Sequence, residues 1–513
     1  MSYINSYKDQ NWLLPPSIKQ MIPENHICFL VEEFIESLDF SEFDLISEGP
    51  GHPSYHPRIL MKILLQGMLS KVRSSRKVSG ATRENLVFMY LAEKIQPNFR
   101  TICRFRRQNA SFIKEAFKET IELASSHDLI DLSLICTDGT TMKANANKNK
   151  SLKKEHVEKL DSIIEKMIEE DIKQDELDKE FYGNNEENIT NLENKNFKEL
   201  VKNYRKQKDK KKLREVCEKT KEEFQKDPEM KRASLTDPEC RMMKNKKGNS
   251  ELSYNAQFTV DSKKQIIVAN DVCQDRTDMN QLEPQVKNVK GNLELKKDTK
   301  FGADCGYNST ENLKFLEEEQ LDGYIPNVTQ AQKLSGRNQT VKQDDYEYDW
   351  KKNEIIVGKT RLKYHATWKH KGEKRQHTYK SEDGLIVKRV PEFFQARLRM
   401  KKKMDSEIGK KVYVLRKTTV EPVIGNIKEN LGLREFSLRG LEKVRIELNL
   451  VSIAHNLKKV WLARGLICDY NKKFVFCVVY TEDYLAIVGQ PVKGGYLVQR
   501  LGVCMSLMLM VNC

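Results

Sequence analysis

Two apolar segments of this sequence each end in an aspartate, and they constrain the fold more than any other feature. Residues 132–143 read LSLICTDGTTMK, in which an apolar run predicts a buried strand that ends at Asp138, before a polar turn. Residues 300–307 read KFGADCGY, and here Asp304 follows a short apolar run. Strand-end aspartates that are distant in the sequence can meet if their strands are neighbours in one sheet. Such a pair of carboxylates suits a divalent metal ion.

The balance of charged residues favours nucleic acid as the partner. The chain has 513 residues, with 89 Lys and Arg against 74 Asp and Glu and a net charge of +15. Because this excess is spread over many acidic residues, we expect local basic patches, which bind phosphates with release of counterions. A basic protein without a nucleic-acid partner has a similar composition, so charge alone does not decide.

Cysteine usage and the apolar segments predict a soluble cytoplasmic protein. The 11 cysteines stand singly, without a Cys-x-x-Cys pair. This pattern fits neither a disulfide framework nor a zinc ribbon and predicts a reducing compartment. The N-terminus has no basic segment followed by an apolar core, and the longest apolar run, Leu501–Val511, is too short to cross a bilayer. We therefore expect no signal peptide and no membrane partner.

Residues 1–130 predict an all-α domain that binds DNA. Apolar residues recur at helical spacing after Pro57, and a further helix is predicted over Glu84–Ile95. The segment FRTICRFRR, residues 99–107, places arginines among aromatic residues, as the second helix of a helix–turn–helix does in a DNA groove. The alternative for this segment is a solvated amphipathic helix. Its four arginines are Arg100, Arg104, Arg106 and Arg107.

The order of elements after this domain predicts an α/β ribonuclease-H-like core, as in retroviral integrases. A first strand carries Asp138, two antiparallel strands follow, and then strands and helices alternate. In such a core the first and fourth strands are neighbours, which would bring Asp138 and Asp304 together. After the first strand, the predicted strands cover 252–261, 265–270, 300–305 and 323–326, and the helices cover 281–289 and 310–320.

Two insertions interrupt the predicted catalytic domain, residues 131–460. Residues 147–250 begin with a Lys- and Glu-rich stretch that predicts one or two long charged helices after the first strand. Residues 327–410 lose the clear pattern and predict a second insertion, partly strand, before the helix with the third acid. Residues 461–513 are an atypical apolar tail, which either adds strands or was acquired by frameshift or read-through.

A third carboxylate is predicted in the segment VYVLRKTTVEPVIGNIKENLG. Thr418 or Thr419 is a reasonable helix N-cap, which places Glu421 in the first turn, where Pro422 is tolerated. Lys428 lies close to two helical turns beyond Glu421, so both would project from one face. Three acids can hold metal ions for phosphoryl transfer, and the lysine can hold a DNA phosphate beside them. The alternative for Glu421 is an ordinary first-turn acid that complements the helix dipole.

Over roughly residues 45–460 the chain resembles bacterial insertion-sequence transposases of the DDE class. The segments that carry the resemblance are HPRILMKILLQGMLSKVRSSRKV, FRTICRFRRQN, CTDGTTMKANANK, SYNAQFTVD, ADCGYNSTENL, RKTTVEPVIGNIKENLG and RGLEKVRIELNLVSIAHNLKK. Each is a weak pattern alone, but together and in this order they are specific. The resemblance implies a ribonuclease-H-like catalytic domain after a DNA-binding domain. It also implies metal-dependent cleavage and strand transfer at terminal inverted repeats.

Carried over to this sequence, the resemblance makes Asp138, Asp304 and Glu421 the metal-binding triad. Lys428 matches a lysine that follows the glutamate after a six-residue gap. In the related signature a tyrosine, an arginine three positions later and a glutamate four positions after that are linked to phosphate contact. Tyr413 and Arg416 have the right mutual gap, but four residues separate Arg416 from Glu421 where the signature has three, and Lys417 stands at the three-residue gap. Relatives often carry a cysteine cluster in the second insertion, which this chain lacks, so no structural zinc is expected.

Other residues compete for these roles. Glu442 and Glu447 lie in RGLEKVRIELNLVSIAHNLKK, a predicted helix with a core-like apolar face. Glu421 is preferred for its placement and its lysine, and Glu447 is the reserve third acid. In some DDE transposases a tryptophan of the second insertion stacks on a flipped base. Trp350 and Trp368 are the candidates here, but we expect such a tryptophan to belong to the core.

The predicted function is DNA transposition by a DDE enzyme with two Mg²⁺ or Mn²⁺ ions, because hard oxygen ligands without a thiolate favour these metals. The substrates would be the terminal inverted repeats and target DNA, both double-stranded. Synapsis of two ends predicts a homodimer in the active complex. The alternatives are a metal-dependent nuclease on the same core that does not join strands, and an inactive DNA-binding remnant of a transposase.

Overall fold

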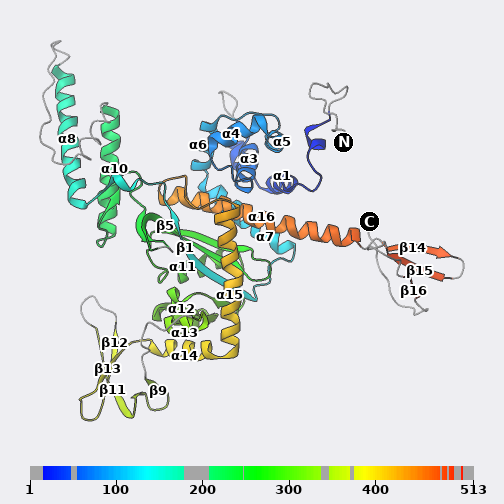
Figure 1. Cartoon of the computed structure of the whole chain (residues 1–513). Coiled ribbons are helices and arrows are strands. Elements are labelled where there is room, and N and C mark those ends of the chain that lie inside the picture. Colours follow the sequence, from blue (N-terminus) through cyan, green and yellow to red (C-terminus); the bar gives the residue numbers. More distant parts are fainter. Residues whose placement is uncertain are drawn as a thin grey trace, which may run out of the picture.

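The computed structural model describes residues 16–47, 55–177, 207–245, 248–336, 346–369, 375–473, 476–481, 484–489 and 498–500. Short α-helices make up the first part of the chain (Figure 1). His56 caps the third helix through its ring nitrogen, with Pro57 in the first turn. The predicted helix over Glu84–Ile95 is wrong in its bounds, because Asn85 ends one helix and caps the next. These helices are η1 (Ile18–Met21), α1 (Ile27–Ser37), α2 (Ser41–Ser47), α3 (Pro57–Leu69), α4 (Ser75–Glu84), α5 (Leu86–Leu91), α6 (Phe99–Gln108) and α7 (Ala110–Ser126).

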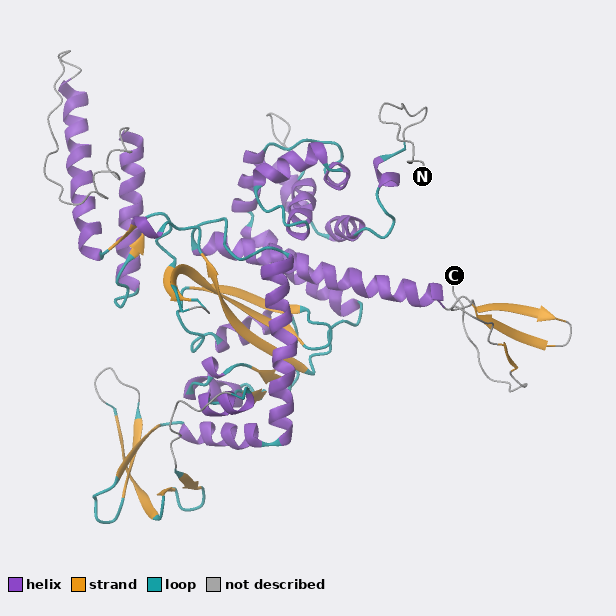
Figure 2. Cartoon of the chain, viewed as in Figure 1, coloured by secondary structure: helices purple, strands orange, loops and turns teal. Residues whose placement is uncertain are grey.

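A twisted sheet forms the centre of the molecule, and its middle strand is β1 (Figure 2). The order is β4-β5-β1-β7-β8, and β6 pairs with the other edge of β5 over much of its length. β5 runs antiparallel to β1 and β6, whereas β7 and β8 run parallel to β1. The strands are β1 (Leu134–Lys143), β4 (Arg241–Lys244), β5 (Ser250–Asp261), β6 (Ile267–Cys273), β7 (Lys300–Gly302) and β8 (Asp322–Tyr324).

The first strand does not end at Asp138, so the predicted polar turn after it is wrong. β1 continues through Gly139 and two threonines to Lys143, paired throughout with β5. The β-branched threonines suit a strand, and the long β5 supplies hydrogen-bonding partners that the local sequence does not reveal. Asp138 therefore lies in the middle of a rigid strand.

Helices cover the sheet and join it to the first part of the chain. α15 packs across β1, β5, β7 and β8, and α11 packs on β5 and β6. The long α16 contacts α3, α7 and β6, so one hydrophobic core runs from the N-terminal helices into the sheet. These helices are α11 (Leu282–Asn292), η3 (Cys305–Tyr307), α12 (Thr310–Glu318), α13 (Val328–Leu334), α14 (Phe394–Asp405), α15 (Glu407–Gly425), the π-helical η4 (Asn426–Asn430) and α16 (Leu441–Lys473).

The Lys- and Glu-rich stretch forms a helical pair beside the sheet. η2 (Lys148–Lys150) and β2 (Ser151–Leu152) lead into α8 (Lys154–Leu177), and α10 (Gln207–Lys226) returns toward β3 (Ala233–Ser234), which pairs with β2. A small core of its own, which includes Leu160, Cys217 and Phe224, holds the two helices together. The sparse apolar residues at helical spacing are sufficient for this separate packing.

The segment that joins α13 to α14 in the sequence forms a second sheet. This sheet lies at the opposite end of the molecule from α8 and α10 (Figure 1). It has the order β13-β12-β11-β10-β9 around a small core that includes Tyr379 and Phe394. Trp350 and Trp368 are 53% and 58% exposed, so the interpretation of both as core residues is wrong. The strands are β9 (Glu347–Asp349), β10 (Glu354–Val357), β11 (Thr360–Trp368), β12 (Gln376–Lys380) and β13 (Val387–Pro391).

The end of the chain extends from α16. This helix continues beyond Trp461, whose indole N–H donates to the carbonyl of Asn25 at 2.8 Å. A three-stranded sheet follows at the far end of the helix (Figure 1), formed by β14 (Phe476–Thr481), β15 (Tyr484–Gly489) and β16 (Val498–Arg500). Within the described ranges, no helix has the length and apolar content needed to cross a membrane.

Candidate active site

Asp138 and Asp304 lie side by side because their strands are parallel neighbours. In the register of β1 and β7, Cys136 is opposite Gly302, and each aspartate stands two residues beyond this pair. Asp304 leaves the sheet just after β7 and caps η3, where its Oδ1 accepts the N–H of Gly306 at 2.8 Å. The prediction that the two strands bring these acids together is supported by this register.

Burial and the proximity of other acids raise the pKa of both carboxyl groups. Burial, followed by repulsion from Asp304, raises the pKa of Asp138 to about 7, although Arg416 opposes the shift. Burial also raises the pKa of Asp304 against the effect of Arg416, and Asp278 raises it further. Two neighbouring carboxylates with raised pKa values are a site where a cation is favoured.

Arg416 links the aspartates to the third acid. It projects from α15, and its side chain is 5% exposed. Nη1 donates to Oδ2 of Asp138 at 3.3 Å, and Nη2 lies 3.9 Å from Oε1 of Glu421. The guanidinium also lies over the ring of Tyr413, with its carbon 5.3 Å from the ring centroid. One buried cation thus contacts an acid from the sheet and an acid from the helix.

The predicted first-turn placement of Glu421 is wrong. α15 begins at Glu407 with Ser406 as its N-cap, so Glu421 lies near the C-terminal end of a long helix and Pro422 is inside it. Thr418 and Thr419 are not caps, because both hydroxyls donate to the carbonyl of Leu415 within the helix. The apolar and basic residues before Thr418 extend the helix backward by three turns.

Lys428 reaches the strand that carries Asp138. It lies in η4, just after α15, and Nζ donates to Oγ1 of Thr140 at 2.6 Å and to the carbonyl of Thr141 at 3.1 Å. Thr140 follows Asp138 by two residues on the same strand, so both side chains point to the same face of the sheet. The lysine therefore belongs to the surroundings of the aspartates.

Asp278 is a further acid at this site that the sequence analysis missed. Its Oδ1 accepts from the side-chain amides of Asn255 at 2.7 Å and Gln257 at 2.6 Å, and Gln257 accepts from the hydroxyl of the fully buried Tyr307. A Cβ on Gly139 would lie 2.1 Å from the same oxygen. The available signal was the polar alternation in β5, whose Asn255 and Gln257 are buried rather than solvated.

The donor set suits a hard divalent cation, although the third acid stands apart. Among the residues that the structure describes, no three His, Cys, Asp or Glu side chains are grouped closely enough to hold a metal ion. Asp138 and Asp304 are adjacent oxygen donors that repel each other. Glu421 is 58% exposed and meets Asp138 through Arg416. The aspartate pair fits a Mg²⁺ or Mn²⁺ ion, and Glu421 is the nearest further acid on α15.

Two stretches of the chain match known protein families. Residues 359–461, which include Arg416, Glu421 and Lys428, match a transposase DDE domain, and residues 16–108 match a transposase domain known as DUF772. These matches identify the chain as an insertion-sequence transposase of the DDE type. No curated protein and no solved structure matches it.

Glu447 of the transposase, the reserve third acid, lies at a junction between domains. Its side chain is fully buried, and Oε1 pairs with Nη2 of Arg73 at 2.5 Å. The other oxygen accepts the backbone N–H groups of Ser437 at 2.8 Å and Leu438 at 3.2 Å. Its pair with Arg73 ties α16 to the N-terminal part of the chain, and its bonds to Ser437 and Leu438 hold the segment before α16; none of its contacts in the described structure is with Asp138 or Asp304.

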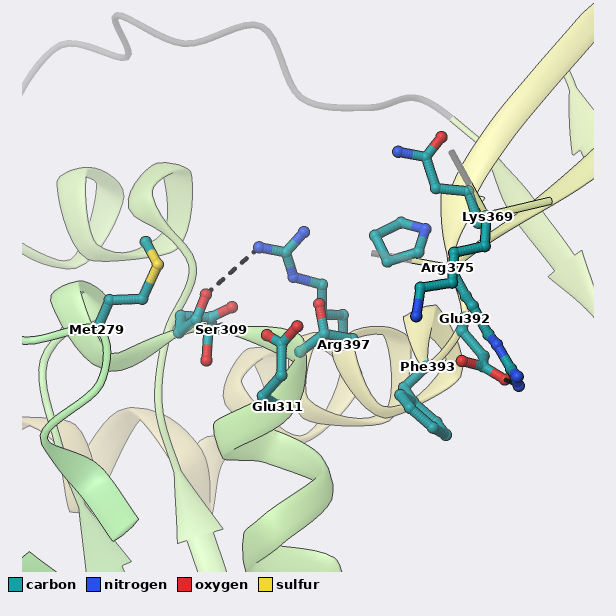
Figure 3. Close-up of a pocket in the computed structure, with 12 residues that line it drawn as sticks. Met279, Ser309, Glu311, Lys369, Arg375, Glu392, Phe393 and Arg397 are labelled. Atoms are coloured by element: carbon teal, nitrogen blue, oxygen red, sulfur yellow. Dashed lines mark hydrogen bonds and ion pairs between the residues drawn. The ribbon is translucent and has the colours of Figure 1, made fainter. Parts of the chain in front are cut away.

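A cleft of about 670 Å³ opens in the transposase beside η3, the short helix that Asp304 caps. Ser309 and Glu311, which follow η3, lie on one side, and Arg375 and Phe393 lie on the other (Figure 3). Arg397 crosses between the two sides and donates to the carbonyl of Asn308 at 3.3 Å. The second sheet is therefore attached to the central sheet close to Asp304.

The arginines of α6 divide into two groups. Arg106 is 4% exposed and donates to the carbonyl of Arg73 at 3.3 Å, so it holds the N-terminal helices together. Arg100, Arg104 and Arg107 are exposed and line a second cavity of the transposase. The amphipathic pattern of the segment thus has one buried arginine and three that face solvent.

Proposed function

We propose that this transposase cuts the phosphodiester bond at the ends of its insertion sequence and joins the freed 3′ end to target DNA. The observation that carries the proposal is the pair of half-buried aspartates, Asp138 on β1 and Asp304 just after the parallel neighbour β7, with Arg416 connecting Asp138 to Glu421. The substrates are the terminal inverted repeats and target DNA, both double-stranded. The match to a transposase DDE domain supports this assignment.

We propose a ribonuclease-H-like core for the catalytic domain. The order β6-β5-β1-β7-β8, with three antiparallel strands followed by two strands parallel to the first, supports it. In this arrangement the charged helical pair is an insertion after the first strand, and the second sheet is an insertion before the helix of Glu421. The helices before β1 act as the DNA-binding domain.

Asp138, Asp304 and Glu421 would hold two Mg²⁺ or Mn²⁺ ions. When bound, these ions supply polarisation of the scissile phosphate and activation of the attacking water or 3′-hydroxyl. Arg416 offsets part of the repulsion between the aspartates before the substrate arrives. Lys428 of η4 reaches Thr140 on the strand face that also carries Asp138, where a DNA phosphate would meet its charge.

The test is a cleavage assay on a labelled duplex that carries the element's end. Asp138→Ala, Asp304→Ala and Glu421→Ala should each abolish Mg²⁺-dependent cleavage while DNA binding in EDTA is retained. Glu294→Ala, which removes an exposed acid ahead of β7, is the matched control and should cut normally. Normal nicking by any of the three site variants would refute the assignment of that acid.

Strand transfer separates transposition from simple hydrolysis. With pre-cut ends and a plasmid target, we expect joined products and a complex that contains two copies of the chain. Cutting without joining would favour a nuclease on the same core. Binding without Mg²⁺-dependent cutting would favour an inactive remnant.

A further inference from the structure

A basic groove lies between the N-terminal helices and the catalytic domain, away from the acidic site. It encloses about 1140 Å³ and is lined by the start of α4, by α6, and by residues around the start of α16. Residue Asn145, which follows β1, also lines it. The cationic side chains on its exposed walls are Arg76, Arg100, Arg104, Arg107, Arg439 and Lys443, and no Asp or Glu is among its lining residues.

Most of the charge in this groove faces no carboxylate within the described ranges, and Asp237 acts on Arg439 only from beyond ion-pair distance. Within the part of the chain that the structure describes, none of these six side chains forms an ion pair. Arg76 and Arg100 lie over the ring of Phe99, with guanidinium carbons 5.0 and 5.9 Å from its centroid. Arg439 donates to the carbonyl of Asn145 at 2.9 Å, which fixes its stem and keeps its charge. Concave walls of one sign concentrate the field, and guanidinium groups match phosphate oxygens in geometry.

The two walls are held in a fixed relation by a buried junction. Arg73, from the loop before α4, donates to the carbonyls of Gly432 at 2.7 Å and Glu435 at 2.5 Å and pairs with the buried Glu447. Arg106 of α6 donates to the carbonyl of Arg73 at 3.3 Å. Both walls therefore meet at Arg73, and the groove exists before DNA binds.

The edge of the groove at Asn145 lies within a bounded distance of the candidate active site. Asn145 follows Asp138 by seven residues (145 − 138), so their Cα atoms are at most about 25 Å apart. A duplex advances 3.4 Å per base pair, so this span corresponds to about seven base pairs.

We propose that this groove grips the phosphate backbone of the same duplex that is cut, within about seven base pairs of the cleaved bond. The proposal rests on the function proposed above. Its new content is that Arg439 and Lys443 of the catalytic domain bind DNA together with α6, so that recognition and chemistry share one rigid body. A sequence-independent backbone contact is the interaction expected of side chains that face phosphates.

The experiment measures binding of a labelled duplex of arbitrary sequence to the full chain in EDTA, as a function of salt. Lys443→Gln and Arg439→Gln should each reduce the slope of log affinity against log salt by about 1, and the double variant by about 2. Lys296→Gln with Lys297→Gln removes the same charge from an exposed loop ahead of β7 and should leave the slope unchanged. An unchanged slope in the double groove variant, or an equal loss in the loop variant, would overturn the proposal.

A second measurement localises the contact and separates the two proposals. Hydroxyl-radical footprinting on a duplex with the element's end should show protection within about seven base pairs of the cut, and the groove variants should lose it. Because binding is measured without metal, loss of cleavage in the Asp138 variant does not affect this result. Normal footprints in both groove variants would contradict the groove proposal while leaving the catalytic assignment intact.

Discussion

At the residue scale, the two neighbouring aspartates impose an electrostatic cost on the metal-free fold. The pKa of Asp138 is raised from 3.8 to about 7, chiefly by burial and next by Asp304. An acid whose pKa is higher in the folded state binds its proton more tightly there than in the unfolded chain. The free energy of unfolding therefore decreases as pH rises from about 4 to about 7, and this loss is complete above the folded pKa.

Asp138→Asn should consequently stabilise the metal-free protein at pH 8 and have little effect at pH 4. The upper bound on the gain is about 4 kcal/mol, from a net shift of about three units that already includes the opposing effect of Arg416. Thermal melts in EDTA across this pH range provide the measurement. A melting temperature that differs from that of the original protein equally at both pH values would contradict the argument.

Glu421 and Glu447 differ in what surrounds them, and this difference separates their roles. Glu447→Gln weakens the pair between the fully buried Glu447 and the partly exposed Arg73 and should lower the free energy of unfolding by about 3–5 kcal/mol, with cleavage per folded molecule retained. Glu421→Gln alters a side chain that is 58% exposed, so cleavage should be lost without a change in melting temperature. Denaturation and Mg²⁺-dependent cleavage are measured on both variants. The reverse pattern would make Glu447 the third acid.

At the element scale, β1 and the segment that carries Asp278 approach each other at a glycine. Gly139→Ala would place a Cβ 2.1 Å from Oδ1 of Asp278 and 2.4 Å from Nε2 of Gln257. We expect this crowding to displace Asp278, to reduce cleavage strongly and to cost about 1–3 kcal/mol of stability. The assays are cleavage of the labelled duplex and thermal denaturation.

The matched control for this variant is Gly80→Ala. Gly80 lies within α4, and a Cβ there meets nothing within 4 Å. Alanine should be neutral or stabilise the helix by about 0.5–1 kcal/mol, with normal cleavage. If Gly139→Ala cuts as well as Gly80→Ala, the close approach of Asp278 has no part in the activity.

The elements differ in how far the sequence predicts them, and the reasons are physical. β5 follows from local apolar alternation, and the adjacency of β1 and β7 follows from the order of elements. The short apolar run before Asp304 indicates β7, but the predicted strand over 300–305 is too long, because β7 ends at Gly302 and Asp304 caps η3. The predicted end of β1 was wrong because pairing with β5, a tertiary interaction, sets the length of this strand. The predicted start of α15 was wrong because Thr418 suits both an N-cap and a helix interior. The N-cap of this helix is Ser406, so the helix begins at Glu407.

Asp278 illustrates the limit of local sequence reasoning at the site. It follows β6 in a polar stretch that resembles an ordinary connection, and only its bonds to Asn255 and Gln257 place it near Asp304. Polar side chains that are buried in a strand need partners, so such residues indicate a network whose other members are distant in the sequence.

At the scale of the whole molecule, α16 is the structural link between the N-terminal helices and the catalytic sheet. The amide of Asn456 bonds to both the N–H and the carbonyl of Ile267 at the start of β6, at 2.9 and 3.0 Å, and to Thr120 of α7 at 3.1 Å. Further along, Trp461 donates to Asn25, and Arg464 pairs with Glu33 at 2.7 Å. The contacts that hold the two parts together thus continue to Arg464.

This continuity predicts where the chain can be shortened. Deletion of residues 465–513 keeps Trp461 and Arg464, so we expect a folded, soluble chain with an unchanged melting temperature. A chain that ends at Val460 loses the indole hydrogen bond, the packing of Trp461 on the core and the pairs of Arg464. It should be less stable by about 2 kcal/mol or more. Thermal melts of the two shortened chains test this prediction. Aggregation of the longer chain, or equal melting temperatures of the two chains, would show that the structural contribution of α16 does not end at Arg464.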